Sequence, residues 1–208
     1  GGPIRYSGIP NRVVAFLSTA LQHLGLEVPI RVIGRQAIAQ HIDALRQELE
    51  LAEQAVRDAT PRPRTNKKGE EKAARPFAKR VADIKTEIRN LEQAASDQFA
   101  ARIIYNDHYS HVSDRTPIII VSDEALNSDK LGSVLAHELG HLVQRAWFDQ
   151  LDPETKMAII NELSPGEWNP DVFAENFADT FMKWYSINRR AGTGANDIRA
   201  ALKRAEVQ

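Results

Sequence analysis

Two histidines, His137 and His141, stand four residues apart with Glu138 beside the first of them. Side chains four residues apart in an α-helix lie one above the other, so this spacing predicts a helix that presents both imidazoles on one side. The other side of that helix carries apolar residues that predict a core-facing surface, namely Leu131, Leu135, Leu139, Leu142, Val143 and Ala146. Two imidazoles suit Zn²⁺, and a neighbouring carboxylate can take a proton from water. We therefore expect a metal-binding helix within residues 128–150; the alternative is an amphipathic helix with two surface histidines.

Two further details of this helix can be predicted. Ser128 is a suitable N-cap, with Asp129 following in the first turn. Gly140 costs about 1 kcal/mol relative to alanine in a helix interior. We expect this small residue to allow another element to approach closely.

A second amphipathic helix is predicted over residues 171–188, where a phenylalanine recurs at every fourth position. Glu175 and Asp179 are also four residues apart and share one face of that helix. Glu175 can complete a set of three protein ligands, which leaves the fourth position of a catalytic zinc ion for water. Asp179 can accept a hydrogen bond from the other ring nitrogen of a bound histidine. Alone, the two acids would form a solvated stripe; together with the paired histidines they predict one Zn²⁺ per chain.

The order of these motifs, His-Glu-Leu-Gly-His followed by Phe-Ala-Glu-Asn-Phe-Ala-Asp at 173–179, resembles that of the gluzincin metallopeptidases. Residues 173–177 also look like the glutamate helix of the lethal-factor-type and the small bacterial or phage gluzincins. The resemblance covers about residues 101–188. It implies a zincin-like fold, zinc as cofactor and one role for each matching residue: His137, His141 and Glu175 as ligands, Glu138 as general base and acid, and Asp179 as the partner of a bound histidine.

Rival zinc-peptidase patterns fit less well. Gln144 and Trp147 stand where the metzincin pattern requires a glycine and a histidine. Of the aspzincin pattern, the sequence contains only a Gly-Thr pair, Gly192 and Thr193. The repressor-cleaving metallopeptidases of mobile elements share the histidine pattern and a downstream glutamate, so they remain an alternative.

A peptidase of this kind needs a further donor for the developing oxyanion. Spacing singles out none of the four candidates for this role or for substrate contact, which are Tyr185, His108, Tyr109 and His111. Trp168 lies in a predicted loop that we expect to overhang the cleft. We also expect the β-prone run 117–121 to be the sheet edge along which a substrate lies extended.

Between these motifs and the N-terminus lie two stripes of apolar residues with heptad spacing, one from Ile38 to Val56 and one from Phe77 to Ala95. The proline- and glycine-rich stretch between them predicts an antiparallel helical hairpin, with a flexible basic tip at about 60–75. We expect this coiled-coil arm to bind a protein partner or to dimerise. For the charged tip we favour a solvated turn over a docking surface, and no aromatic residues interleave with its basic ones to indicate nucleic-acid binding.

The other patterns indicate an α+β fold. Short β-prone runs predict a small mixed sheet at 28–33, 101–106 and 117–121, and apolar periodicity predicts further helices at 10–24, 153–163 and 197–207. A hydrophobic content of 42% is sufficient for one sizeable core. We expect residues 1–34 and 100–208 to form a zincin-like catalytic domain whose sheet packs on the two site helices, and residues 35–99 to form an inserted hairpin.

The overall charge and composition exclude several other classes. The net charge of −1 provides no general attraction to nucleic acid or membranes, and the absence of cysteine excludes disulfides and thiolate metal sites. The first residues do not have the pattern of a signal peptide and no apolar run reaches about 20 residues, so we expect neither a signal peptide nor a membrane span in this sequence. We expect a soluble protein, cytoplasmic or delivered as part of a larger one, that acts as a zinc-dependent endopeptidase on a protein or peptide. The alternative of another class is a catalytically idle zincin-fold protein that binds partners through its arm.

Overall fold

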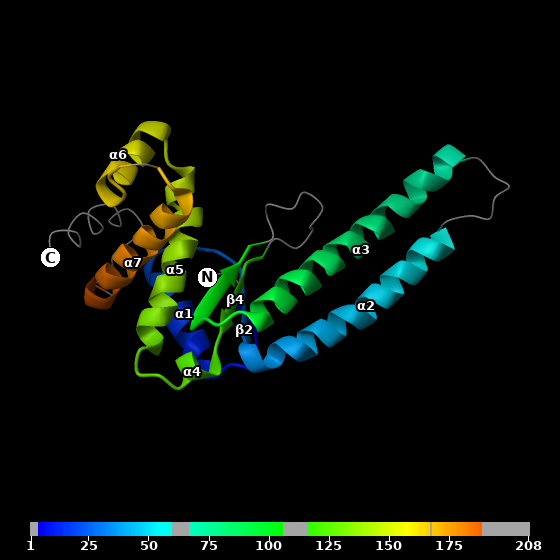
Figure 1. Ribbon diagram of the computed structural model, residues 1–208, viewed down its shortest axis with the longest axis horizontal. Helices are drawn as coiled ribbons and strands as arrows, with labels where there is room; N and C mark the ends of the chain where they lie inside the picture. Colours follow the sequence, from blue (N-terminus) through cyan, green and yellow to red (C-terminus); the bar gives the residue numbers. More distant parts are fainter. Residues whose placement is uncertain (1–3, 60–66, 106–115, 167, 189–208) are drawn as a thin grey trace.

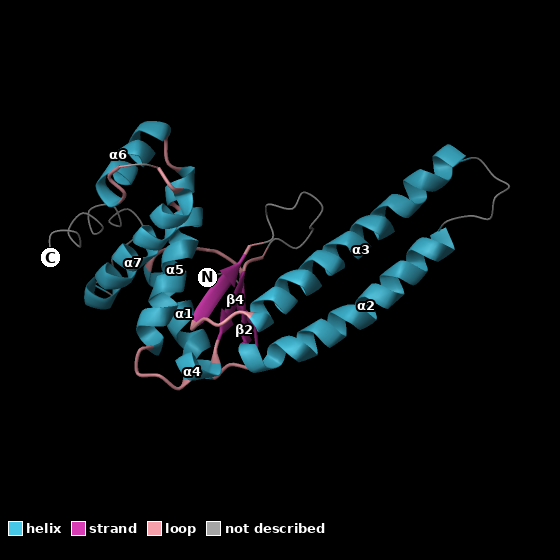
Figure 2. Ribbon diagram, in the orientation of Figure 1, coloured by secondary structure: helices cyan, strands magenta, loops and turns pink. Residues whose placement is uncertain are grey.

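The computed structural model describes residues 4–59, 67–105, 116–166 and 168–188 (Figure 1). A helical body surrounds a small sheet, and a long two-helix arm projects from one side of that body (Figures 1 and 2). The fold is therefore of the α+β class, as predicted. The predicted helix at 197–207 lies outside the described residues.

The sheet of the described chain contains four strands in the order β1-β2-β4-β3. These strands are β1 (Ile4–Ser7), β2 (Ile30–Gly34), β3 (Ala101–Ile104) and β4 (Ile118–Val121). The first three in the sheet order are parallel, and β3 pairs antiparallel with β4. The predicted runs account for three strands, whereas β1 was not predicted because its sequence, IRYS, is too short and polar to show a pattern.

The expectation that residues 117–121 form the substrate edge of the sheet is wrong. All four residues of β4 are buried, because the strand lies inside the sheet with helices on both faces. A strand buried on both faces reads as an uninterrupted apolar run, and its position in the sheet depends on its partners. The edge near the histidine helix is β3, whose residues are only partly buried or exposed.

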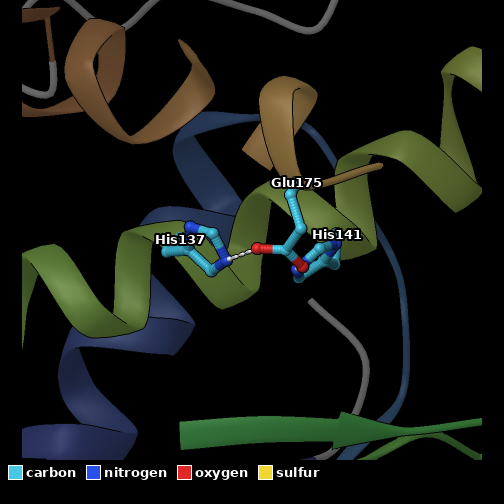
Figure 3. Close-up of side chains that lie close together, drawn as sticks. All are labelled: His137, His141 and Glu175. Atoms are coloured by element: carbon cyan, nitrogen blue, oxygen red, sulfur yellow. Dashed lines mark ion pairs between the residues drawn. The ribbon is translucent and has the colours of Figure 1, made fainter. Parts of the chain in front are cut away.

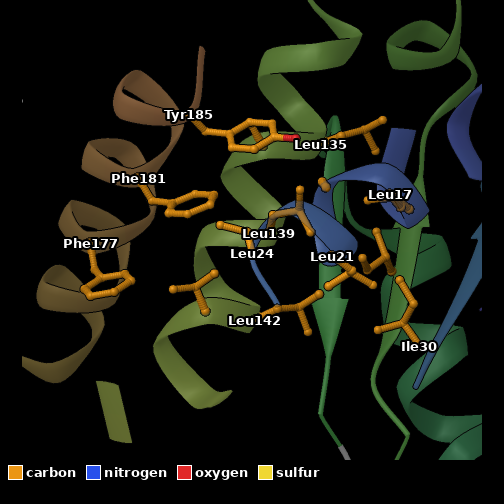
Figure 4. Packing of buried hydrophobic residues seen from close by; sticks show 14 of the residues in the cluster. Leu17, Leu21, Leu24, Ile30, Leu135, Leu139, Leu142, Phe177, Phe181 and Tyr185 are labelled. Carbon is orange, nitrogen blue, oxygen red and sulfur yellow. The ribbon is translucent and has the colours of Figure 1, made fainter. Parts of the chain in front are cut away.

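One face of the sheet carries the main core. The core is formed with α1 (Asn11–His23) and with the two site helices, α5 (Leu131–Ala146) and α7 (Pro170–Asn188), and α6 (Pro153–Leu163) adds Ile159 and Leu163 to it. Leucines of α1 and α5 interdigitate with aromatic rings of α7 in this layer (Figure 4). The short helix α4 (Asp123–Leu126) connects β4 to α5, and Ser122 caps it.

The start of α5 differs from the prediction. The helix begins at Leu131, and Ser128 accepts a hydrogen bond from the backbone N–H of Lys130 at 3.1 Å, in the turn before the helix. Ser128 is therefore not the N-cap, and Asp129 is not in the first turn.

The other face of the sheet holds the base of the arm, which consists of α2 (Ile38–Ala59) and α3 (Lys67–Ser96). Ile33, Ile118 and Ile120 of the sheet form a second core with the first turns of α2 and the last turns of α3. Further out, the two helices are joined by Arg46–Glu92 at 2.9 Å and Lys85–Glu53 at 3.2 Å. Such exposed pairs contribute at most about 1 kcal/mol each, so the heptad seam provides most of the attraction.

The tip of the arm is shorter than predicted. The expected non-helical tip covered about 60–75, but α3 already begins at Lys67 and continues through Pro76. Residues 70–74 are strong helix formers, which explains the earlier start. The remaining tip, 60–66, lies outside the described residues.

Gly140 allows the two site helices to approach closely, as predicted. A Cβ atom at this position would lie 2.7 Å from Cα and 3.0 Å from the carbonyl oxygen of Ala178. Backbone atoms cannot yield at such distances without moving a whole helix. Glycine thus sets the separation between α5 and α7.

We expect Gly140→Ala to lower the free energy of unfolding by about 1–3 kcal/mol, because overpacking outweighs the gain in helix propensity. Gly132→Ala, in the same helix, is the matched control: its new Cβ would meet only Phe16 Cε2, at 3.9 Å. The control should be neutral or more stable by up to about 1 kcal/mol. Urea denaturation of both variants checks this, and equal effects would show that the contact with Ala178 has no energetic weight.

Candidate metal centre

Two stripes of polar residues face each other where α5 packs against α7. On α5 the stripe is His137, His141 and Arg145; on α7 it is Asp171, Glu175 and Asp179. Residues within each stripe are four apart, which places them on one helix face. His137 contacts Glu175 and Asp179, whereas His141 contacts Glu175. The helices therefore run antiparallel, with a register that continues to Arg145 and Asp171.

Where the two stripes meet, three side chains form a group suited to a metal ion. The Nε2 atoms of His137 and His141 each lie 3.2 Å from an oxygen of the Glu175 carboxylate (Figure 3). One donor atom from each of the three residues lies within 4.8 Å of the other two. Two imidazoles and one carboxylate form a donor set that fits a divalent transition metal. The predicted residues His137, His141 and Glu175 are thus brought together.

Asp179 orients one of these imidazoles. Its Oδ1 lies 2.9 Å from Nδ1 of His137. Because an ionised carboxylate only accepts hydrogen bonds, this contact places a ring proton on Nδ1. That is the proton position that leaves Nε2 to bind a metal ion.

The two remaining ionisable groups have perturbed pKa values. Burial lowers the pKa of His141, with nearby His137 adding to the shift and Glu175 opposing it, so the ring is held neutral and able to bind a metal. Burial, and secondly the charge of Glu175, raise the pKa of Glu138 to about 8. Its side chain is 5% exposed, which means that a carboxyl group is kept beside the histidines at the expense of its hydration.

The group opens into a cleft of about 300 Å³ above the edge strand. His137, Glu138, His141 and Glu175 line it on the helix side, and Ala101, Arg102, Ile103 and Tyr105 line it on the strand side. Ala101, Ile103 and Tyr105 alternate along the chain and so face the helices together. The carboxyl group, the three donors and the strand edge thus share one solvent-accessible space.

Two of the other predicted residues, Tyr185 and Trp168, do not line this cleft. Tyr185 lies in the core, 5% exposed and stacked on Phe181 with ring centres 5.7 Å apart, so its expected role at the oxyanion is wrong. Trp168 packs against Phe173 rather than against the described lining of the cleft. His108, Tyr109 and His111 lie outside the described residues.

Three residues near the cleft were missed by the sequence reasoning. Tyr105 directly follows β3 and lines the cleft, and the guanidinium carbon of Arg145 lies 3.7 Å from the centre of its ring. Asp171 lies in the first turn of α7. The four-residue spacing that selected the ligands also contains Arg145, one turn after His141, and Asp171, one turn before Glu175, so the sequence held a signal for both.

A second cavity, of about 400 Å³, lies on the arm side of the sheet. Its two acidic residues are already paired with arginines, Glu87 with Arg31 at 2.5 Å and Glu48 with Arg80. In the described part of the chain, the group formed by His137, His141 and Glu175 is the one that could hold a metal ion. The cleft above β3 is therefore the candidate functional site.

Comparisons with protein-family models, curated proteins and solved structures found no match to this chain. No helix within the described ranges combines the length and the apolar character needed to cross a membrane.

Proposed function

We propose that this chain is a zinc-dependent endopeptidase with a zincin-like catalytic domain of the gluzincin type. The observation that carries the proposal is the convergence of two imidazole nitrogens from α5 and one carboxylate from α7 within 4.8 Å. Three protein ligands are typical of catalytic zinc sites, whereas structural sites use four. The position of β3, α5 and α7 around one cleft supports the proposal.

Zinc bound by these three residues would supply a Lewis acid that acidifies water and polarises a substrate carbonyl. Glu138 follows His137 in the same helix and lines the same cleft, where its carboxyl is 5% exposed. In this position it accepts the proton of the attacking water and delivers it to the leaving amine. A metal site with a structural role alone would have no use for a buried carboxyl group beside its ligands.

The substrate is expected to lie along β3. This strand pairs with β4 on one side, and no described strand covers its other side. An extended peptide can add to such an edge through backbone hydrogen bonds, while the pockets beside the edge select side chains. The substrate backbone would then lie beside Ala101, Ile103 and Tyr105, which face the donors across the cleft, and the scissile bond would lie opposite the donors.

The direct test is metal-dependent cleavage of an unstructured protein. We expect the zinc-loaded chain to produce new N-termini from such a protein, to lose activity with a chelator and to regain it when zinc is restored. Mass spectrometry of the products and of the bound metal gives both readouts. A zinc-loaded chain that leaves unstructured proteins intact under all conditions would contradict the proposal.

A further inference from the structure

We propose that the base of the arm forms one wall of the substrate cleft, where Gln93 of α3 contacts a substrate side chain that points away from the metal group. The side chains that fit this wall are uncharged and polar, namely those of serine, threonine, asparagine and glutamine. This inference rests on the proposed function, because it assigns a preference to an extended peptide bound along β3.

The first observation is a cavity of about 540 Å³ around the edge of β3 that no described strand covers. Ile103 and Tyr105 line it on the sheet face that carries the main core, and Arg102 and Ile104 line it on the opposite face. Neighbouring strands of a sheet lie about 4.8 Å apart, so a peptide that pairs with β3 enters this space. The cavity therefore offers room for substrate side chains on both faces of the sheet.

Different helices close the cavity on the two faces. Arg145 and Asp171 of the site helices line it on the face of the main core, and the last turns of α3 line it on the other face through Asn90, Gln93 and Ala94. Side chains of an extended peptide alternate between the two faces. When one side chain faces the metal group, its two neighbours in the peptide face α3. The inserted arm is thus part of the cleft.

The wall formed by α3 is fixed relative to the sheet. Ile88, Leu91 and Ala94 pack into the second core. Arg35, the first residue after β2, donates a hydrogen bond to the carbonyl oxygen of Ala95 at 2.9 Å. A wall that is held in this way can distinguish between side chains, because it does not move to accommodate each of them.

The chemistry of this wall favours an uncharged polar side chain. Among the described residues that line this side, the charged one is Arg102, and it is ion-paired with Asp97. Gln93 is exposed, and its side-chain amide makes no hydrogen bond to another described residue. An amide both donates and accepts, so it can pair with a hydroxyl or with another amide. A charged group in the same place would lose hydration without gaining an ion pair.

The test measures binding, so that it does not depend on turnover. The zinc-loaded chain would be titrated with short fluorescent peptides that carry a hydroxamate at one end, because this group binds zinc and fixes the register of the peptide. One series carries it at the N-terminus and the other at the C-terminus, and each position in turn is Gln, Glu or Lys among alanines. We expect Gln to bind about 5-fold more tightly than Glu or Lys at one position. The adjacent positions should not share this preference, because their side chains face the opposite wall.

Charge substitutions assign that position to α3. Gln93→Glu should make Lys bind about 3-fold more tightly than Glu there, and Gln93→Lys should reverse this order. Gln22→Glu and Gln22→Lys are the matched controls, because Gln22 is an exposed residue of α1 that lines neither cavity. These controls should keep the preference of the parent chain. Circular dichroism and zinc content show whether each variant is folded and loaded.

The proposal is overturned if no position prefers Gln in the parent chain, or if the order of Glu and Lys does not follow the charge at position 93. Equal shifts in the Gln22 variants would also overturn it, since they would indicate an effect of net charge. If the peptides bind as expected but the chain cleaves no unstructured protein, the endopeptidase assignment fails while this inference stands. If the chain cleaves proteins and the Gln93 variants keep every preference unchanged, this inference fails alone.

Discussion

Glu138→Gln should retain one zinc ion per chain and lose about 10²–10⁴-fold in kcat/KM for peptide hydrolysis. Glutamine has nearly the shape of glutamate, so the buried position remains filled and the three donor residues keep their places. The amide cannot accept the proton of the attacking water. Quantitative cleavage assays on the zinc-loaded variant, with metal content measured on the same sample, check both halves of this expectation.

Glu124→Gln is the matched control for that substitution. Glu124 is an exposed residue of α4 and does not line the cleft. We expect its activity and zinc content to equal those of the parent chain. Full activity of Glu138→Gln would remove Glu138 from its role. Zinc binding by a parent chain that cleaves nothing would favour the idle interaction protein instead.

Removal of any one of the three donors should abolish stoichiometric zinc binding. His137→Ala, His141→Ala and Glu175→Ala each leave two protein ligands, too few for a site that needs three. The rise in melting temperature that zinc causes in the parent chain should disappear with them, since that rise follows from metal bound to the folded state. Metal analysis after dialysis and thermal melts with and without zinc measure these losses.

Two further variants serve as comparisons for the three donor substitutions. His23→Ala, at the end of α1, removes a histidine outside the metal group and should bind zinc normally. Asp179→Asn keeps all three donors but weakens the acceptor that orients His137, so zinc affinity should fall by about 10–100-fold rather than vanish. Unchanged zinc binding by Glu175→Ala would separate α7 from the metal site.

Most helices and the three donor residues of the metal group could be predicted because both depend on local spacing. The four-residue separation of His137 and His141, and of Glu175 and Asp179, fixes a shared helix face wherever the helix lies. The heptad stripes likewise predicted α2 and α3. The same rule could have revealed Arg145 and Asp171. It could also have placed Tyr185 in the core, because Phe177, Phe181 and Tyr185 follow one another at the same spacing.

Other features had no local signal. The four residues of β4 were expected at the sheet edge, but the strand order places β3 there instead. Serine is a residue type that N-caps favour, yet the Ser128 hydroxyl accepts a hydrogen bond in the turn before the helix. A strand's place in a sheet and a helix's first residue both depend on which segments pack around them, so composition alone does not determine them.

The sequence by itself determined which donors share a helix face and that two such faces exist. Only the tertiary structure decided that the faces meet in one register, with His137 opposite Asp179, 42 residues later in the chain. That register depends on the close contact between Gly140 and Ala178 and on the phenylalanines of α7 in the main core. The spacing of residues on one helix face repeats along the sequence. The register between two helices results instead from packing of surfaces that are distant in sequence, and no periodic pattern encodes it.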